Sequence, residues 1–279
     1  MKFNLKNILK ILLYCFAFIG FSFVAVFIAM QFGWLNVKGS VSERNSYFNL
    51  NNKIKKENVT QPADTSVWAS SDEWKLMREV FTRDQAMIKK AGIDAGISPR
   101  LIISGVMGEQ FRFMTNRRES FKQYFEPMKI LASLSKFSFG IAGLKPETVK
   151  LVEEHLKDEK STFYLGKEME HVADYSDRIG SDSERMTRIT DVKNPYYPYL
   201  YVGLFMRQVM AQWKNAGYDI DNRPEIISTL YNLGFNRSIP KADAQAGGAP
   251  IDINGTTYTF GDLGYEFYYS NELTDVFPL

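Results

Sequence analysis

The sequence has little cysteine and little histidine, and both shortages exclude classes of site. Its 279 residues include one cysteine, Cys15, inside an apolar run, so no disulfide can form within the chain. The two histidines, His155 and His171, stand alone in the sequence and are too few for a zinc site built from His and Cys ligands. We therefore predict no metal site and no cofactor.

The sequence also has little excess charge. Its formal net charge is +2, and no basic stripe is interleaved with aromatic residues. We therefore expect no nucleic acid among its partners. In contrast, 45% of the residues are hydrophobic, and the length allows one or two domains.

One long run near the N-terminus, Ile11 to Met30, carries no charge. At 1.5 Å per residue it covers about 30 Å, the thickness of a bilayer core. Lys2, Lys6 and Lys10 precede it, which favours an N-terminus in the cytoplasm. A secretory signal usually has an apolar core of roughly 7–15 residues and a small-residue cleavage site. We therefore predict an uncleaved transmembrane helix in preference to a cleaved signal peptide.

The composition then divides the chain into four parts. Residues 1–10 form the cytoplasmic N-terminus, 11–35 the transmembrane anchor, 36–66 a polar tether and 67–279 a folded domain. Helical periodicity dominates the folded part, which predicts an all-α fold. Asn254-Gly255 between short apolar segments predicts one small β-hairpin near the C-terminus.

Apolar spacing and capping residues give the helix positions. Either Ser70 or Ser71 is suited to cap the first helix and Ser98 the second, and Pro99 suits the first helical position. The segment 158–193 is charged and weakly periodic, which indicates a surface excursion. The predicted helices cover Ser71–Ala95, Ser98–Asn116, Glu119–Ser135, Pro146–Lys157, Tyr197–Asn215 and Pro224–Leu233, with a last short helix within Phe260–Phe277.

The helix predicted at Ser98–Asn116 has a carboxylate on its apolar face. Glu109 follows Ile102 by seven residues and Val106 by three, and so shares their side of the helix. Burying a carboxylate is costly unless it is paired or used. Two interpretations stay open: a catalytic acid beside the space left by Gly105 and Gly108, or a structural ion pair with Arg112, Arg117 or Arg118.

Three segments occur in an order that resembles the lysozyme-like lytic transglycosylases, a family related to the goose-type lysozymes. They are GVMGEQFRF around Glu109, SFGIAGLKPETV from Ser138, and STLYNLGF with Tyr231 and Asn232. In that family a glutamate ends a core helix, a glycine-rich segment shapes the cleft, and a Tyr-Asn motif completes it. The resemblance covers about residues 72–236 and implies a lysozyme-like fold.

The resemblance implies that Glu109 is the catalytic acid and base. It also implies a substrate cleft lined by Gln110, Ser138, Gly140, Gly143, Leu144, Tyr231 and Asn232. The chain departs from the family pattern at three positions. Gln110 replaces the common serine, Gly143 a common glutamine, and Leu230 the alanine before Tyr-Asn.

The implied reaction cleaves the bond between N-acetylmuramic acid and N-acetylglucosamine in peptidoglycan. A single glutamate protonates the leaving oxygen, and the 6-hydroxyl of the muramic residue attacks to give a 1,6-anhydro end. A carboxyl on an apolar face suits the acid step, because burial raises its pKa. The departures keep two alternatives open: a non-catalytic peptidoglycan-binding or scaffold protein, and a hydrolytic lysozyme.

The resemblance also implies a location and partners. Peptidoglycan glycan strands are the expected substrate, and the N-terminal helix is expected to hold the chain in a bacterial cytoplasmic membrane. The folded domain would then lie on the periplasmic or other extracytoplasmic side. Proteins of an envelope or secretion complex are the expected protein partners.

Overall fold

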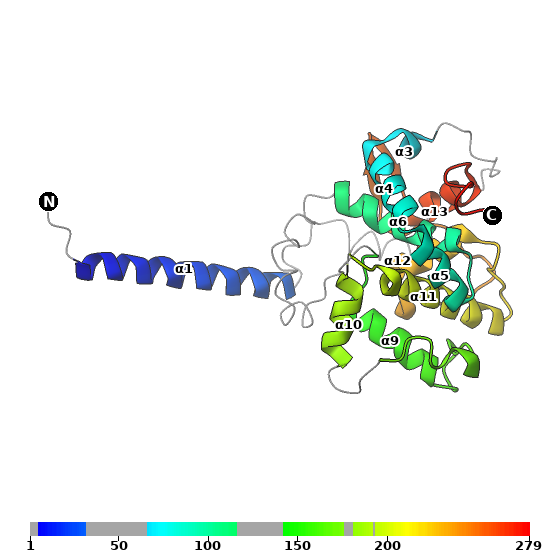
Figure 1. Ribbon diagram of the computed structural model, residues 1–279, viewed down its shortest axis with the longest axis horizontal. Helices are drawn as coiled ribbons and strands as arrows, with labels where there is room; N and C mark the ends of the chain where they lie inside the picture. Colours follow the sequence, from blue (N-terminus) through cyan, green and yellow to red (C-terminus); the bar gives the residue numbers. More distant parts are fainter. Residues whose placement is uncertain (1–4, 32–65, 116–141, 176–180, 192) are drawn as a thin grey trace. The chain divides into compact units, whose positions relative to one another are not determined.

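The computed structural model describes residues 5–31, 66–115, 142–175, 181–191 and 193–279. The chain divides into two units, Met1–Phe48 and Asn49–Leu279, and helix predominates in the described parts of both (Figure 1). The helix predicted at Glu119–Ser135 and the predicted cleft residues Ser138 and Gly140 lie outside the described residues.

The described part of the first unit is helix α1 (Leu5–Gln31). Within the residues that the structure describes, no helix is long and apolar enough to cross a membrane. The prediction of a transmembrane anchor at 11–35 is therefore wrong.

The second unit contains the rest of the described helices and one hairpin. In chain order its elements are α3 (Val67–Ser70), α4 (Asp72–Arg83), α5 (Gln85–Ala95), α6 (Pro99–Thr115), α9 (Pro146–Lys157), η2 (Lys167–Met169), α10 (Ser181–Thr190), α11 (Tyr196–Asn215), α12 (Pro224–Leu233), η3 (Phe235–Arg237), β1 (Ile251–Ile253), β2 (Thr256–Tyr258) and α13 (Phe260–Tyr269).

Two helices organise the core of this unit. Helix α11 contacts α5, α6, α9, α10 and α12, and α6 contacts α4, α5, α11, α12, α13 and β1. α11 is buried on most sides because its apolar residues are not confined to one face. Gly203 allows close packing against α5, since a Cβ there would lie 2.8 Å from the Cβ of Ala95. The site-bearing helix α6 is therefore held on several sides.

The first long helix predicted from the sequence is divided in the structure. Of the two expected caps, Ser71 caps α4, and it accepts a hydrogen bond of 3.1 Å from the backbone N–H of Trp74. The prediction of one continuous helix to Ala95 is wrong, because α4 ends at Arg83 and Asp84 separates it from α5. The buried Asp84 carboxylate accepts hydrogen bonds from Arg83 Nε at 2.7 Å and from the Tyr199 hydroxyl at 3.0 Å.

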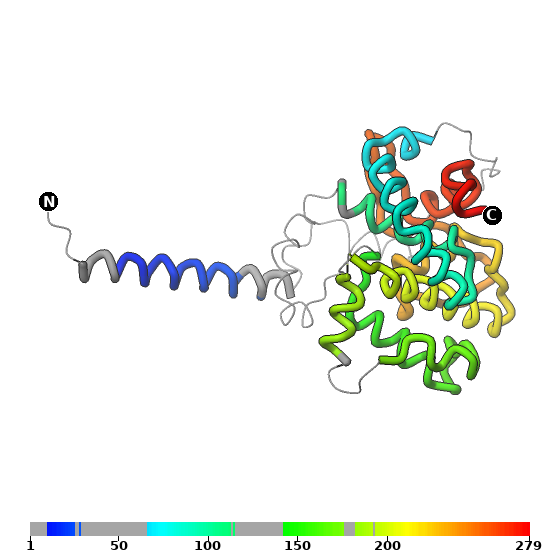
Figure 2. The backbone as a smooth tube through the Cα atoms, in the orientation of Figure 1, coloured from blue at the N-terminus to red at the C-terminus, as the bar shows by residue number. Residues whose placement is uncertain are grey.

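The C-terminal part packs on helices from the start of the unit. The tube in Figure 2 shows α3 and α4, in cyan, beside the orange and red C-terminal segments, and the indole N–H of Trp68 donates to Glu266 at 2.8 Å. Strands β1 and β2 pair antiparallel, with Ile251 opposite Tyr258. Their turn has the sequence predicted for a tight hairpin, with positive φ at Asn254 (49°) and Gly255 (82°).

One arginine fastens this C-terminal segment to α6. Arg100 is fully buried and stacks on the ring of Phe267 at 4.6 Å. Its guanidinium donates hydrogen bonds to five backbone carbonyls, those of Phe267, Tyr268, Ser270, Glu272 and Phe277. Carbonyl dipoles thus stabilise a buried charge, and the end of the chain is fixed against the helix that carries Glu109.

Candidate functional site

Glu109 lies in the third turn of α6, on the side that faces the core. It is 8% exposed, and its helical neighbours Ile102 and Val106 are fully buried. The space predicted beside it at Gly105 and Gly108 is filled. A Cβ at Gly105 would lie 2.3 Å from Met206 Cε, and one at Gly108 would lie 2.5 Å from the Phe260 ring. These glycines therefore let neighbouring side chains approach the helix closely.

The Glu109 carboxylate forms an ion pair with Arg112, one turn further along α6. The bond runs from Arg112 Nη2 to Glu109 Oε2, while the Arg112 guanidinium lies 5.7 Å from the centre of the Phe260 ring. Arg112 Nε is buried and has no hydrogen-bond partner. A buried donor without an acceptor destabilises a fold, so this nitrogen needs an explanation.

The segment 142–144 packs directly on the carboxylate. Gly143 has φ +62°, and a Cβ at this position would lie 2.6 Å from Glu109 Oε2. Both the left-handed backbone and the close contact require glycine. Leu144 is 2% exposed and belongs to the core. The glycine that replaces the common glutamine thus brings the backbone to the carboxylate.

Tyr231 on α12 completes this arrangement from the other side. Its hydroxyl donates a hydrogen bond of 2.6 Å to the carbonyl of Ala142, the residue before Gly143. Burial raises the pKa of Tyr231 well above its ordinary value, the Glu109 charge raises it further, and Arg112 opposes this effect. The hydroxyl therefore stays protonated and serves as a donor. Glu109, Gly143 and Tyr231 thus meet in one place.

The next residue, Asn232, holds a different segment. It is 8% exposed, and its side-chain oxygen accepts a hydrogen bond of 2.9 Å from the backbone N–H of Ala249. Its amide nitrogen, Nδ2, is buried and has no hydrogen-bond partner. Gln110 is half-buried on α6. The roles predicted for these residues stay predictions, as do those of Ser138 and Gly140.

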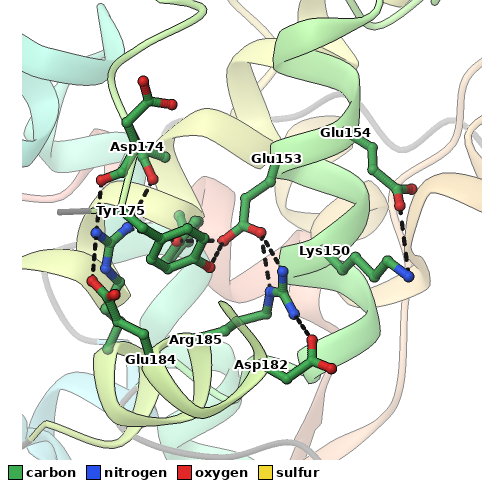
Figure 3. A network of polar contacts seen from close by, with 11 residues as sticks. Lys150, Glu153, Glu154, Asp174, Tyr175, Asp182, Glu184 and Arg185 are labelled. Atoms are coloured by element: carbon green, nitrogen blue, oxygen red, sulfur yellow. Dashed lines mark hydrogen bonds and ion pairs between the residues drawn. The ribbon is translucent and has the colours of Figure 1, made fainter. Parts of the chain in front are cut away.

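A second polar cluster lies between α9, α10 and α11 (Figure 3). At its centre Glu153 accepts hydrogen bonds from Arg185 Nε and Nη2, at 3.0 and 2.6 Å, and from the hydroxyl of Tyr201 at 2.7 Å. The hydroxyl of Tyr175 also donates to it. This carboxylate is thus satisfied at both oxygens, which is typical of a structural ion pair.

The same cluster corrects the expectation of a surface excursion at 158–193 for helix α10, whereas the described residues 158–172 are exposed or partly buried, as expected. Helix α10 buries Arg185 and Arg188 together with Met186 and Ile189. Arg188 donates to the carbonyls of Ala173 and Asp174, and its guanidinium stacks between two tyrosine rings. Apolar residues three apart, Met186 and Ile189, were the available signal, but the interleaved arginines concealed it.

Metal ligands and known relatives add no further assignment. In the described ranges, no group of three or more His, Cys, Asp or Glu side chains is placed to hold a metal ion. Comparisons with family models, with curated proteins and with solved structures found no match. The three motifs and the contacts around Glu109 therefore remain as the indications of function.

Proposed function

We propose that this protein is a peptidoglycan lytic transglycosylase in which Glu109 is the acid and base. One observation carries the proposal: residues from all three motifs converge on one carboxylate. Gly143 packs against Glu109, and Tyr231 binds the carbonyl of Ala142 beside it. These residues are far apart in the chain, and a convergence on a mostly buried carboxylate supports a shared role for them.

The chemistry needs one carboxyl group. Protonated Glu109 would give its proton to the glycosidic oxygen as the bond to the muramic C1 breaks and positive charge develops there. The resulting carboxylate would then take the proton of the 6-hydroxyl as that oxygen bonds to C1. The products are a 1,6-anhydro end and a free 4-hydroxyl, no water is consumed, and Glu109 is again protonated. Because the substrate lies outside the cytoplasm, we propose extracytoplasmic action.

A second candidate function is peptidoglycan binding without cleavage. The ion pair between Glu109 and Arg112 favours it, because a general acid must present a proton and not a bound guanidinium. The same observation is compatible with an enzyme if substrate displaces Arg112. The two functions make opposite statements about products, so digestion separates them.

The test is digestion of purified peptidoglycan by the full chain, using intact sacculi and sacculi stripped of stem peptides by an amidase. Products are analysed by mass spectrometry. We expect 1,6-anhydro muropeptides with the wild type and a loss of at least about 100-fold in Glu109→Gln. The matched control is Glu154→Gln, which changes an exposed glutamate on α9. Reducing-end products would instead establish a lysozyme, and binding without products would establish the second candidate.

A further inference from the structure

Arg112 has a guanidinium nitrogen, Nε, that is buried and makes no hydrogen bond in the fold. Nη2 is bonded to Glu109, whereas Nε is buried with no partner. Among the described residues Arg188 Nε is also unpartnered, but Arg188 is 5% exposed and stacked between two rings at 4.1 and 4.0 Å. The Arg112 side chain is 19% exposed. A ligand can therefore reach Arg112, while stacking covers Arg188.

Asn232 also has an unpartnered donor, and it lies near Phe260, the residue whose ring is close to the Arg112 guanidinium. Asn232 Nδ2 is buried without a partner, although the residue's oxygen is bonded to Ala249. Gly248 links Asn232 to Phe260, since a Cβ there would lie 3.2 Å from Asn232 Oδ1 and 3.0 Å from Phe260 Cβ. The Arg112 guanidinium is 5.7 Å from the ring of the same Phe260. Arg112 and Asn232, each with one unpartnered donor, thus both lie near Phe260.

Unpartnered donors beside a partly open guanidinium require an acceptor, and a carboxylate matches the guanidinium best. Its two oxygens accept parallel hydrogen bonds from the fork of an arginine. On the substrate class proposed above, the carboxylate nearest the cleaved bond is the lactyl group at C3 of the muramic residue. That group is free where the stem peptide has been removed and is an amide where the peptide remains.

We infer that Arg112 binds the free lactyl carboxylate of the muramic residue, and that this binding releases Glu109. The inference rests on the proposed function and adds a substrate preference, for glycan strands without stem peptides. One carboxylate replaces another on the guanidinium, so the ion pair is kept. Among the described residues, Gly143 lies against the Glu109 carboxylate, and the Glu109 charge acts on Tyr231. Release from Arg112 frees the Glu109 carboxyl to meet the glycosidic oxygen, as the acid of the proposed reaction must.

The experiment measures binding, so it does not depend on cleavage. The probes are a tetrasaccharide of alternating N-acetylglucosamine and N-acetylmuramic acid with free lactyl carboxylates, and the same tetrasaccharide with each carboxylate converted to its methylamide. Full-length Glu109→Gln is titrated with both by calorimetry. We expect the acid to bind about ten-fold more tightly than the amide, the range of one charge-assisted hydrogen bond.

Adding Arg112→Gln to this variant should abolish the preference, and Arg112→Lys should weaken it because lysine keeps the charge but lacks the fork. Adding Arg78→Gln, at an exposed arginine on α4, should leave it unchanged. Circular dichroism and thermal melting verify that each variant is folded. Equal affinity for acid and amide in folded Glu109→Gln overturns the inference, as does a preference that survives both Arg112 substitutions.

The proposed function is tested separately, by measuring the products of glycan cleavage. If the wild type forms 1,6-anhydro ends at the same rate from acid and amide glycans, the enzyme stands and the role of Arg112 is wrong. If no glycan is cleaved but the acid preference depends on Arg112, the carboxylate site stands and the enzyme is wrong.

Discussion

Among the described residues of the folded unit, the pairs Glu153–Arg185 and Glu109–Arg112 lie largely buried, and they differ in how completely their hydrogen-bonding groups are satisfied. In the pair Glu153–Arg185, the three guanidinium nitrogens donate to Glu153 or Asp182, and two tyrosine hydroxyls also donate to Glu153. In the pair Glu109–Arg112, one guanidinium nitrogen is bonded to the glutamate, while Nε is buried without a partner.

The two pairs also differ in whether they join separate helices. Glu153 and Arg185 join helices α9 and α10, so their contact contributes to the tertiary fold. Glu109 and Arg112 lie three residues apart on α6, so helix geometry alone brings them together. Breaking the second pair therefore separates no elements. A satisfied pair between helices is suited to stability, and an under-satisfied pair within one helix is suited to exchange with a ligand.

The largest expected effect is on stability, and it tests this contrast directly. Glu153→Gln should lower the free energy of unfolding by about 3 kcal/mol, because it leaves the Arg185 charge buried without its main partner. Glu109→Gln should lower it by about 1 kcal/mol or less, since Arg112 is partly exposed and an i,i+3 pair contributes little. Urea denaturation followed by tryptophan fluorescence measures both.

The control for this pair of variants is Arg185→Gln, which should match Glu153→Gln because each removes one half of the same contact. A double variant should then be no worse than either single one by more than about 1 kcal/mol. If Glu109→Gln proves as destabilising as Glu153→Gln, the Glu109 pair is structural and the contrast fails.

A smaller effect is expected at Gly143, where the backbone meets the carboxylate. Gly143→Ala should lower the free energy of unfolding by about 2 kcal/mol, from the strained positive φ and the clash with Glu109. Gly217→Ala is the matched control, because Gly217 also has a positive φ (+87°) but open space around it. Gly217→Ala should lower the free energy of unfolding by about 1 kcal/mol, because it strains the backbone at a positive φ without a side-chain clash.

The difference between the two alanine variants isolates the contact with Glu109. Glycan cleavage should fall in Gly143→Ala and stay unchanged in Gly217→Ala. Equal losses of stability together with equal activity would mean that the segment 142–144 does not rest on a working carboxylate.

Local rules in the sequence were enough to predict much of the fold. The helix at Pro224–Leu233 begins at a proline and ends before a glycine, and the hairpin turns at Asn254-Gly255. Helix α11 was found because a run that is apolar on most sides predicts a central helix. These features depend on residues close in the chain, which is why spacing and capping reveal them.

Tertiary contacts explain what the sequence did not reveal. At the break, the buried Asp84 accepts a hydrogen bond from Tyr199, more than a hundred residues away. Similarly, the burial of Glu109 could be predicted from its position on the apolar face of the helix. Its contact with Gly143 could not, because a glycine in the sequence permits a positive φ but does not show that the backbone adopts one. The ion pair with Arg112 was one of the alternatives left open, and no pattern in the sequence indicated that Nε lacks a partner.

The smallest expected effect concerns Tyr231 and is seen best as a function of pH. At pH 7, Tyr231→Phe should lower the free energy of unfolding by about 1 kcal/mol, because the hydrogen bond to Ala142 is lost. Burial raises the pKa of Tyr231 well above its ordinary value of 10.0, so the folded protein keeps a proton that the unfolded chain releases in alkali. That stabilisation is complete below pH 10 and decreases above it, by up to about 1.4 kcal/mol per pH unit. The variant should therefore equal or exceed the wild type in stability near pH 11.

Tyr201→Phe extends this test to the satisfied pair. Its hydroxyl donates to the Glu153 carboxylate and not to a backbone carbonyl, and the pKa of Tyr201 is also raised by burial and by Glu153. A hydrogen bond to a charged group contributes more than one to a neutral group, so the cost at pH 7 should be about 2 kcal/mol. Urea denaturation at pH 7, 9 and 11 gives both profiles. A larger loss in Tyr231→Phe than in Tyr201→Phe at pH 7 would mean that the region around Glu109 is the more tightly held of the two, which reverses the assignment of binding to one pair and stability to the other.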